Sequence, residues 1–167
     1  EIAFIRQHIL AKLGIQHRQP LTDRRHPVAI RAGQPRTRAA KIAQRQQTRL
    51  GRLSRRASFP FFKTIDDFNF TYQSTVRLSL LGSALAADFI TEGRSLIFFG
   101  KPGRGKTHLA VAVAYRAIQN GFDAHFTTAA ELIDELSSAF RQGCLAEALT
   151  TYTHPDLLVV DEVGYLT

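Results

Sequence analysis

Residues 100–107, with the sequence GKPGRGKT, restrict the possible folds of this chain more than any other segment. They fit the pattern of glycine, four spacers, glycine, lysine and a hydroxyl residue, in which backbone amides surround phosphate groups. The apolar run at residues 95–99 precedes this loop and predicts a buried strand. The Ala- and Val-rich run at residues 108–119 follows it and predicts a buried helix. A strand, a glycine-rich loop and a helix in this order are typical of an α/β nucleotide-binding fold.

A second apolar run, residues 157–160, ends directly before Asp161 and Glu162. Fixed donors must replace the water that solvates a triphosphate, and loop amides at a helix N-terminus supply such donors. We therefore expect ATP as the ligand and Mg²⁺ as its cofactor. Thr107 and Asp161 are expected to hold the metal ion, and Glu162 is the candidate general base for an attacking water. The predicted nucleotide-binding residues are Gly100, Lys101, Pro102, Gly103, Arg104, Gly105, Lys106, Thr107 and His108.

The remaining pattern predicts a parallel sheet with helices on both faces. Helices are expected at residues 38–57, 75–92, 108–119, 128–142 and 144–152, and strands at 95–99, 124–127 and 157–160. Thr128 and Glu131 have the spacing of a capping box. In the helix that follows, Leu132, Ile133, Leu136 and Phe140 are expected to face inward. Strands that alternate with helices favour an α/β architecture.

The formal net charge of +8 is unevenly distributed along the 167 residues. Residues 1–63 hold 15 Lys and Arg but only two acids, whereas residues 64–167 hold seven Lys and Arg against 12 acids. We therefore divide the chain into a basic N-terminal arm, residues 1–62, partly helical and partly disordered, and an ATPase portion, residues 63–167. A basic arm gains affinity for nucleic acid by releasing condensed counterions, so DNA is an expected partner.

Other features of the composition set limits on the location of the protein. The single cysteine, Cys144, excludes an intrachain disulfide and agrees with a reducing cytoplasm. No apolar run approaches the roughly 18 residues of a membrane span, and the N-terminus lacks the apolar core of a signal peptide. We expect a cytoplasmic protein without a membrane partner.

GKPGRGKTHLA at residues 100–110 and DEVGYL at 161–166 resemble the IstB-like transposition-helper ATPases, which are AAA+ proteins related to the DnaC helicase loaders. KTIDDFNF at residues 63–70 is also similar to that family, whose members commonly carry Asp where this chain has Asn69. The resemblance extends over residues 38–167. It implies an AAA+-type P-loop NTPase fold that binds ATP with Mg²⁺, assembles as a homo-oligomer on DNA and activates a partner transposase.

The same resemblance implies that the chain is truncated. The family's sensor strand, its arginine finger and its C-terminal lid would all lie beyond Thr167, so the fold is expected to be incomplete C-terminally. ATP hydrolysis in the complete family also needs an arginine from the next subunit.

Three alternative functions stay open at this point. A DnaC-like helicase loader would share the ATP site but act on a replicative helicase. An inactive truncated remnant would bind nucleic acid only through its basic arm. A small-molecule P-loop kinase would need an acceptor pocket, for which the sequence offers no candidate residues.

Overall fold

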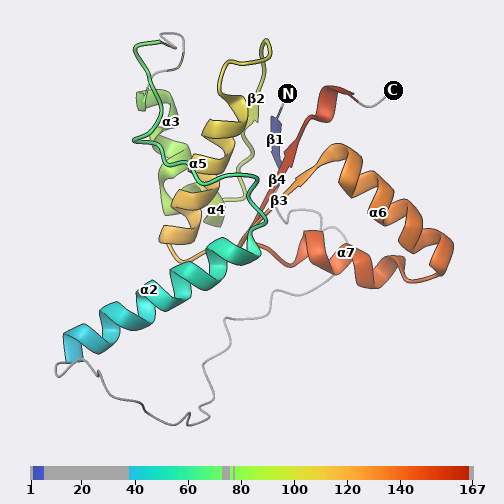
Figure 1. Cartoon of the computed structure of the whole chain (residues 1–167), viewed down its shortest axis with the longest axis horizontal. Helices are drawn as coiled ribbons and strands as arrows, with labels where there is room; N and C mark the ends of the chain where they lie inside the picture. The colour runs from blue at the N-terminus through green and yellow to red at the C-terminus, as the bar shows by residue number, and fades with distance from the viewer. Residues whose placement is uncertain (1, 6–37, 73–75, 77, 166–167) are drawn as a thin grey trace.

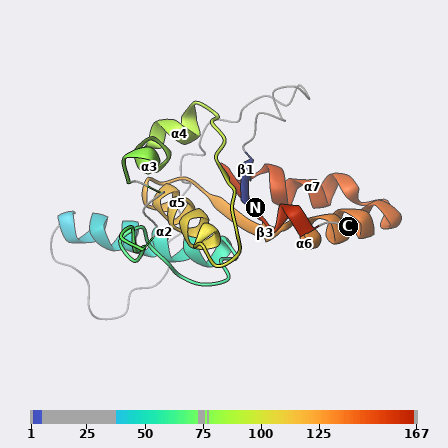
Figure 2. The same ribbon diagram turned by 90° about the horizontal axis from the view of Figure 1, so that it is seen from above.

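The computed structural model describes residues 2–5, 38–72, 76 and 78–165 of the chain (Figure 1). Helices cover both faces of a small sheet, and the views in Figures 1 and 2 agree on this arrangement. In chain order the elements are β1 (Ile2–Ile5), α2 (Arg38–Arg56), α3 (Leu78–Leu85), α4 (Ala87–Thr91), β2 (Ile97–Phe98), α5 (Lys106–Gln119), β3 (Ala124–Thr128), α6 (Ala129–Gln142), α7 (Leu145–Thr153), β4 (Leu157–Asp161) and the 3₁₀ turn η1 (Val163–Tyr165).

The described part of the sheet has four strands in the order β2-β1-β4-β3. β3 and β4 are parallel, with Ala124 opposite Leu157 and Thr128 opposite Asp161. β1 is antiparallel to both of its neighbours, β2 and β4. The α/β class predicted from the sequence is confirmed, but the sheet is mixed rather than wholly parallel. The sequence interpretation did not predict β1, and the rest of residues 1–37 lies outside the described residues.

The two faces of the sheet are covered by different helices. On one face, α5 packs with the ends of α2 and α4 over Leu157 and Val159. On the other face, Leu158 and Val160 pack against Ala129 and Tyr152 of α6 and α7. This alternation along β4 is the two-residue period of a strand that is buried on both sides.

The predicted strand at residues 95–99 is shorter and more exposed than we expected. Only Ile97–Phe98 forms β2, and the side chains of Ile97 and Phe99 are 66% and 85% exposed. β2 is exposed because it lies at one edge of the described sheet. α6 contacts β3, which lies at the opposite edge. Phe98, which points to the other face, packs against the core.

α6 begins and ends as the sequence predicts, but its inward face is narrower. Thr128 and Glu131 form the predicted capping box, and Gly143 closes the helix in a left-handed conformation. Leu132 and Leu136 face the core as expected. Ile133 and Phe140, however, are 46% and 71% exposed, so the expectation that they face inward was wrong. The core-facing row is completed instead by Ala129 and Ala139, which are buried on α6 at helical spacing from the two leucines.

The predicted helix over residues 75–92 is divided into α3 and α4 by the extended backbone of Ala86. The Leu85 carbonyl at this break accepts a hydrogen bond of 3.2 Å from the Asn120 side chain, which replaces an intrahelical partner. Gly93 has a φ of +71° after α4, as expected for a glycine that follows a helix end.

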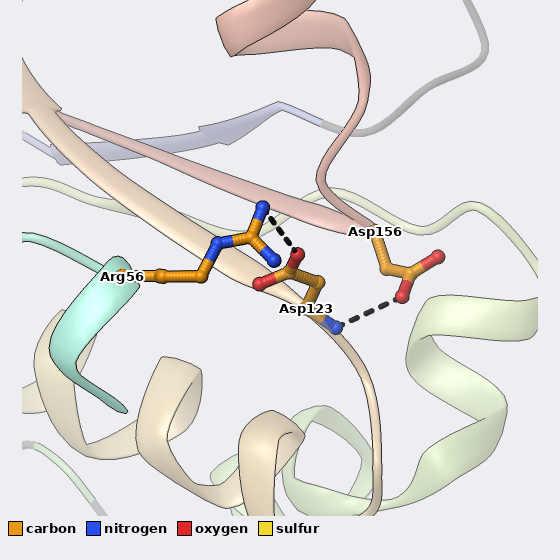
Figure 3. A network of polar contacts seen from close by, with 3 residues as sticks. All are labelled: Arg56, Asp123 and Asp156. Carbon is orange, nitrogen blue, oxygen red and sulfur yellow. Dashed lines mark hydrogen bonds and ion pairs between the residues drawn. The ribbon is translucent and has the colours of Figure 1, made fainter. Parts of the chain in front are cut away.

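α2 is attached to the globule at its C-terminal end, and its outer part extends away from the rest of the chain in Figure 1. Leu53 and Ala57 are buried, and the Ala57 carbonyl accepts a 2.8 Å hydrogen bond from the Phe126 amide of β3. Figure 3 shows a polar contact at the same junction, where the Arg56 guanidinium lies 3.6 Å from the Asp123 carboxylate. The Asp123 amide in turn donates to the Asp156 carboxylate at 2.9 Å.

Across the described residues, no helix combines the length and the apolar character needed to cross a membrane.

Candidate nucleotide-binding site

The loop between β2 and α5 owes its course to two glycines with left-handed backbones. Gly103 has a φ of +73° and Gly105 a φ of +79°, a conformation that glycine adopts without the strain of a side chain. Gly105 is also the N-cap of α5 and has no side chain that could accept from the first amides of the helix. Those amides lack intrahelical partners and carry the positive end of the helix dipole, so they can receive an anion.

Lys106 is the first residue of α5, and its ammonium group turns back over the loop. Its Nζ donates to the Lys101 carbonyl at 2.9 Å. This contact holds the cation beside the loop amides rather than in open solvent. The spacers Lys101 and Arg104 are exposed.

Thr107 connects the loop to the end of β4. Its hydroxyl donates to the Asp161 Oδ2 at 2.8 Å, although 54 residues separate the two side chains in the sequence. Asp161 is buried, and its Oδ1 accepts from the Glu162 amide at 2.8 Å. The predicted metal-binding pair is therefore brought together by the fold.

Glu162 is exposed and follows β4 with a φ of +60°, which is uncommon for a residue with a side chain. Outliers of this kind are concentrated at active sites and binding sites. This turn directs the chain out of the sheet immediately after Asp161, at the C-terminal end of β4, where the Thr107 hydroxyl also lies.

One carboxylate oxygen and one hydroxyl oxygen from the chain suit Mg²⁺, which usually keeps several waters and takes its other ligands from phosphates. In the described ranges, no group of three or more His, Cys, Asp or Glu side chains could hold a metal by itself. The oxygens of Thr107 and Asp161 thus fit an ion that arrives with a nucleotide, whereas a metal bound by protein ligands alone has no such site there.

A short segment at the start of the ATPase portion, residues 64–72, braces the loop from outside. The His108 ring lies 3.0 Å from the Thr64 carbonyl through Nε2, and it makes an edge contact with the Phe68 ring. Phe68 is buried, and a Cβ added to Gly105 would lie 2.7 Å from its Cε2 atom. Position 105 therefore requires glycine for a second reason besides its positive φ.

Local hydrogen bonds shape this bracing segment. The Asp67 carboxylate accepts from the amide and the hydroxyl of Thr64 at 2.7 and 2.8 Å. The backbone hydrogen bond from Thr64 is the main cause that lowers the pKa of Asp67 below its usual range. The Asn69 Oδ1 accepts from the amides of Thr71 and Tyr72, both at 3.0 Å. An Asp at this position would offer the same acceptor.

Sequence motifs predict the loop and the two acids, but no motif indicates the closeness of Phe68 to Gly105. Phe68 is buried against Leu81 and Leu109, so its ring belongs to the core beside the loop. For His108, the ring is used against Thr64 and Phe68, so nucleotide binding would depend on its backbone amide.

A cleft of about 380 Å³ lies elsewhere, at the N-terminal ends of β3 and β4. It is far along both strands from Asp161, so we assign it no part in nucleotide binding. Its lining consists of Arg56, Asp123, Ala124, His125, Thr150, Thr151, His154 and Pro155.

Residues 38–167 match the model of the family described as IstB-like ATP binding protein. The chain is 36% identical to the insertion sequence IS5376 putative ATP-binding protein of Geobacillus stearothermophilus, over 76% of this chain and 51% of that protein. It is 31% identical to the insertion sequence IS21 putative ATP-binding protein of Pseudomonas aeruginosa, over 67% of this chain and 42% of that protein.

The replicative helicase loader DnaC of Escherichia coli strain K12 is 37% identical over 44% of this chain and 31% of its own length. The chain spans about half the length of the insertion-sequence relatives that it matches. Because the family model covers the bracing segment, the glycine-rich loop and the strand that ends in Asp161, the chain belongs to the family of IstB-like ATP-binding proteins.

Proposed function

We propose that residues 63–167 form the ATP-binding part of a helper protein for DNA transposition. The observation that carries the nucleotide assignment is the 2.8 Å hydrogen bond between Thr107 and Asp161. It brings the phosphate-type loop and the acidic strand end to one point, which is the arrangement required for phosphate and metal binding. The names of the insertion-sequence relatives support the connection with transposition.

In this proposal the residues of the loop divide the work of binding. The amides at the start of α5 receive phosphate oxygens, and Lys106 releases the Lys101 carbonyl to neutralise the β and γ phosphates. Thr107 and Asp161 would hold Mg²⁺, which when bound reduces the negative charge on the phosphates. Glu162, exposed beside Asp161, would accept a proton from the attacking water.

Nucleotide binding is tested by titration of a fluorescent ATP analogue in the presence of Mg²⁺. Lys106→Ala should abolish binding, whereas Arg116→Ala, which removes a cation from the far end of the same helix, should leave it intact. Binding by Lys106→Ala with the affinity of the parent would refute the assignment of this loop.

The role of Glu162 is tested in a chain extended through the downstream residues that longer relatives possess. Glu162→Gln should retain ATP binding and lose turnover, because the amide cannot accept the proton of water. Hydrolysis by this variant at the parent rate would remove Glu162 as the general base.

We further propose that the exposed cationic surface of α2 binds DNA. The helix contains no acid, and five of its cations are exposed without the contacts to the globule that Arg49 and Arg56 make: Arg38, Lys41, Arg45, Arg52 and Arg55. Phosphate contacts by such side chains release counterions, so the affinity should fall steeply with added salt.

The DNA-binding proposal is tested with a duplex of arbitrary sequence at several salt concentrations. The double variant Arg45→Glu and Arg52→Glu should weaken binding by about tenfold or more and reduce the salt dependence. The double variant Arg116→Glu and Arg141→Glu changes the net charge by the same amount outside α2 and serves as the control. A flat salt response, or equal loss in the control, would contradict a specific role for α2.

A helicase loader is the second candidate, because the similarity to DnaC covers 44% of the chain. The insertion-sequence relatives cover 67% to 76% of it, which favours the transposition role. Assembly as a homo-oligomer on DNA and activation of a transposase are parts of this proposal. Co-purification with a transposase would support it, whereas co-purification with a replicative helicase would support the alternative.

A further inference from the structure

The two strands that carry the candidate ATP site are not neighbours in the sheet. β2 leads into the glycine-rich loop and β4 ends in Asp161, but β1 lies between them. Ala3 is paired with Ile97 on one side and with Val160 on the other, and Ile2 is paired with Phe98 and Asp161. A segment from the beginning of the chain therefore joins the two halves of the site through its backbone.

β2 depends on this junction more than β4 does. Among the described residues, β1 is the only strand that pairs with β2, whereas β4 also pairs with β3. β2 is two residues long and one of its side chains, Ile97, is largely exposed. The position of the strand that precedes the loop therefore depends on β1 and on the packing of Leu96 and Phe98 against the core.

The width of β1 sets the separation of the two functional strands. Neighbouring strands lie about 4.8 Å apart, so one intervening strand places β2 and β4 about 10 Å apart. Without β1 the inner edges of both strands would carry unpaired backbone groups, or β2 would move about 5 Å to pair with β4 directly. The move of β2 would break the 2.8 Å contact of Thr107 with Asp161, because a hydrogen bond does not survive such a displacement. In the other case no strand would pair with β2 to hold it at the required distance.

We propose that β1 is a positioning strand of the ATP site, which holds the glycine-rich loop at the distance from Asp161 that metal and phosphate binding require. This inference rests on the proposed nucleotide binding for its functional meaning. It assigns to the backbone of residues 2–5 a role that the glycine-rich loop motif does not contain.

The first experiment removes the strand and then returns it as a separate molecule. A chain that lacks residues 1–5 should bind the MgATP analogue about tenfold or more weakly, because fewer than one chain in ten would then hold the competent arrangement. A synthetic peptide of residues 1–6 should restore the affinity when it is added in excess. The same peptide with Ala3→Pro should not restore it, because proline lacks the amide that a central strand must donate.

The second experiment keeps the chain whole. Ala3→Pro should weaken nucleotide binding, and Ala3→Ser, which retains the amide, is the matched control. Hydrogen exchange followed by mass spectrometry should show faster exchange in Ala3→Pro within residues 94–99 and 157–163. This readout reports on the strand junction without any nucleotide, so it separates a failure of β1 from a failure of ATP binding.

Each outcome of these two experiments either supports or overturns the positioning role of β1. Recovery with the natural peptide alone, together with faster exchange beside β1 in Ala3→Pro, supports the positioning role. The positioning role is overturned if the shortened chain binds the MgATP analogue with the affinity of the parent. It is also overturned if the natural peptide fails to restore that affinity, whether or not the shortened chain is folded. If the parent itself binds no nucleotide, the proposed function fails, and unchanged exchange in Ala3→Pro would then show that β1 does not hold the two strands either.

Discussion

Gly105→Ala gives the most direct test of how the glycine-rich loop is built. The substitution adds one methyl group at a residue whose φ is +79°. That methyl would lie 2.7 Å from the Phe68 Cε2 atom, closer than two carbon atoms can approach. The Phe68 ring is only 8% exposed and packs against Leu81 and Leu109, so it has little room to move away.

The size of the effect follows from two separate costs. A left-handed backbone costs a residue with a Cβ about 1–2 kcal/mol, which is offset by about 0.4–1 kcal/mol because alanine restricts the unfolded chain. Overpacking against Phe68 adds about 1–3 kcal/mol. We therefore expect Gly105→Ala to lower the free energy of unfolding by about 2–4 kcal/mol.

Gly103→Ala is the matched control for this prediction. Its φ is +73°, but nothing lies within 4 Å of the added Cβ, so only the backbone cost applies. That cost is about 1 kcal/mol. Phe68→Leu removes the far edge of the ring, and in this background Gly105→Ala should cost no more than Gly103→Ala does in the parent.

The measurement is urea unfolding followed by circular dichroism without nucleotide, so that the result does not depend on ligand binding. The four chains with and without Gly105→Ala and Phe68→Leu form a double-mutant cycle, and the coupling energy should be about 1–3 kcal/mol. Equal destabilisation by Gly103→Ala and Gly105→Ala, or a coupling energy near zero, would refute the argument that Phe68 braces the loop.

Three further predictions concern hydrogen bonds and charge. Thr107→Val should lower the free energy of unfolding by about 1.5–3 kcal/mol, because it removes a donor to the buried Asp161 carboxylate; Thr91→Val, whose hydroxyl donates at an exposed helix end, should change urea unfolding far less. Thr128→Ala should cost about 1 kcal/mol through loss of the capping box with Glu131, and a change within error would contradict the role of this cap. Burial lowers the pKa of His125, so the unfolded chain takes up a proton before the folded one and stability should fall as the pH decreases below the ordinary histidine value of about 6.5. In thermal unfolding, the melting temperature of His125→Gln should fall less than that of the parent over the same pH interval. Equal falls in melting temperature would exclude His125 as a source of the pH dependence.

The local signals in the sequence predicted those parts of the fold that neighbouring residues determine. Thr128 and Glu131 stand three residues apart, and their side chains satisfy each other's backbone amides, which requires nothing from the rest of the chain. The loop from Gly100 to Thr107 is likewise a local structure, since its glycines permit the turn and the start of α5 supplies the amides. The order of elements from β2 to β4 followed from the same kind of pattern.

Contacts between distant segments were not predictable in this way. The pairing of Ala3 with both Ile97 and Val160 depends on which edges of the other strands are available, and no periodicity in residues 2–5 indicates that choice. Phe140 is 71% exposed, although its spacing from Leu136 suggested an inward face. Phe68 lies 37 residues before Gly105, and only the fold shows that its ring excludes a methyl group there.

The one-sided attachment of α2 has a mechanical consequence. The helix has 19 residues and a length of about 28 Å, yet its buried side chains are confined to the final turn. It is therefore a lever whose fulcrum lies beside β3, where Phe126 donates to Ala57 and Arg49 reaches the Gly121 carbonyl at 2.8 Å. A pull on the outer end of this lever would load both the strand edge at β3 and α5, the helix that begins at the glycine-rich loop.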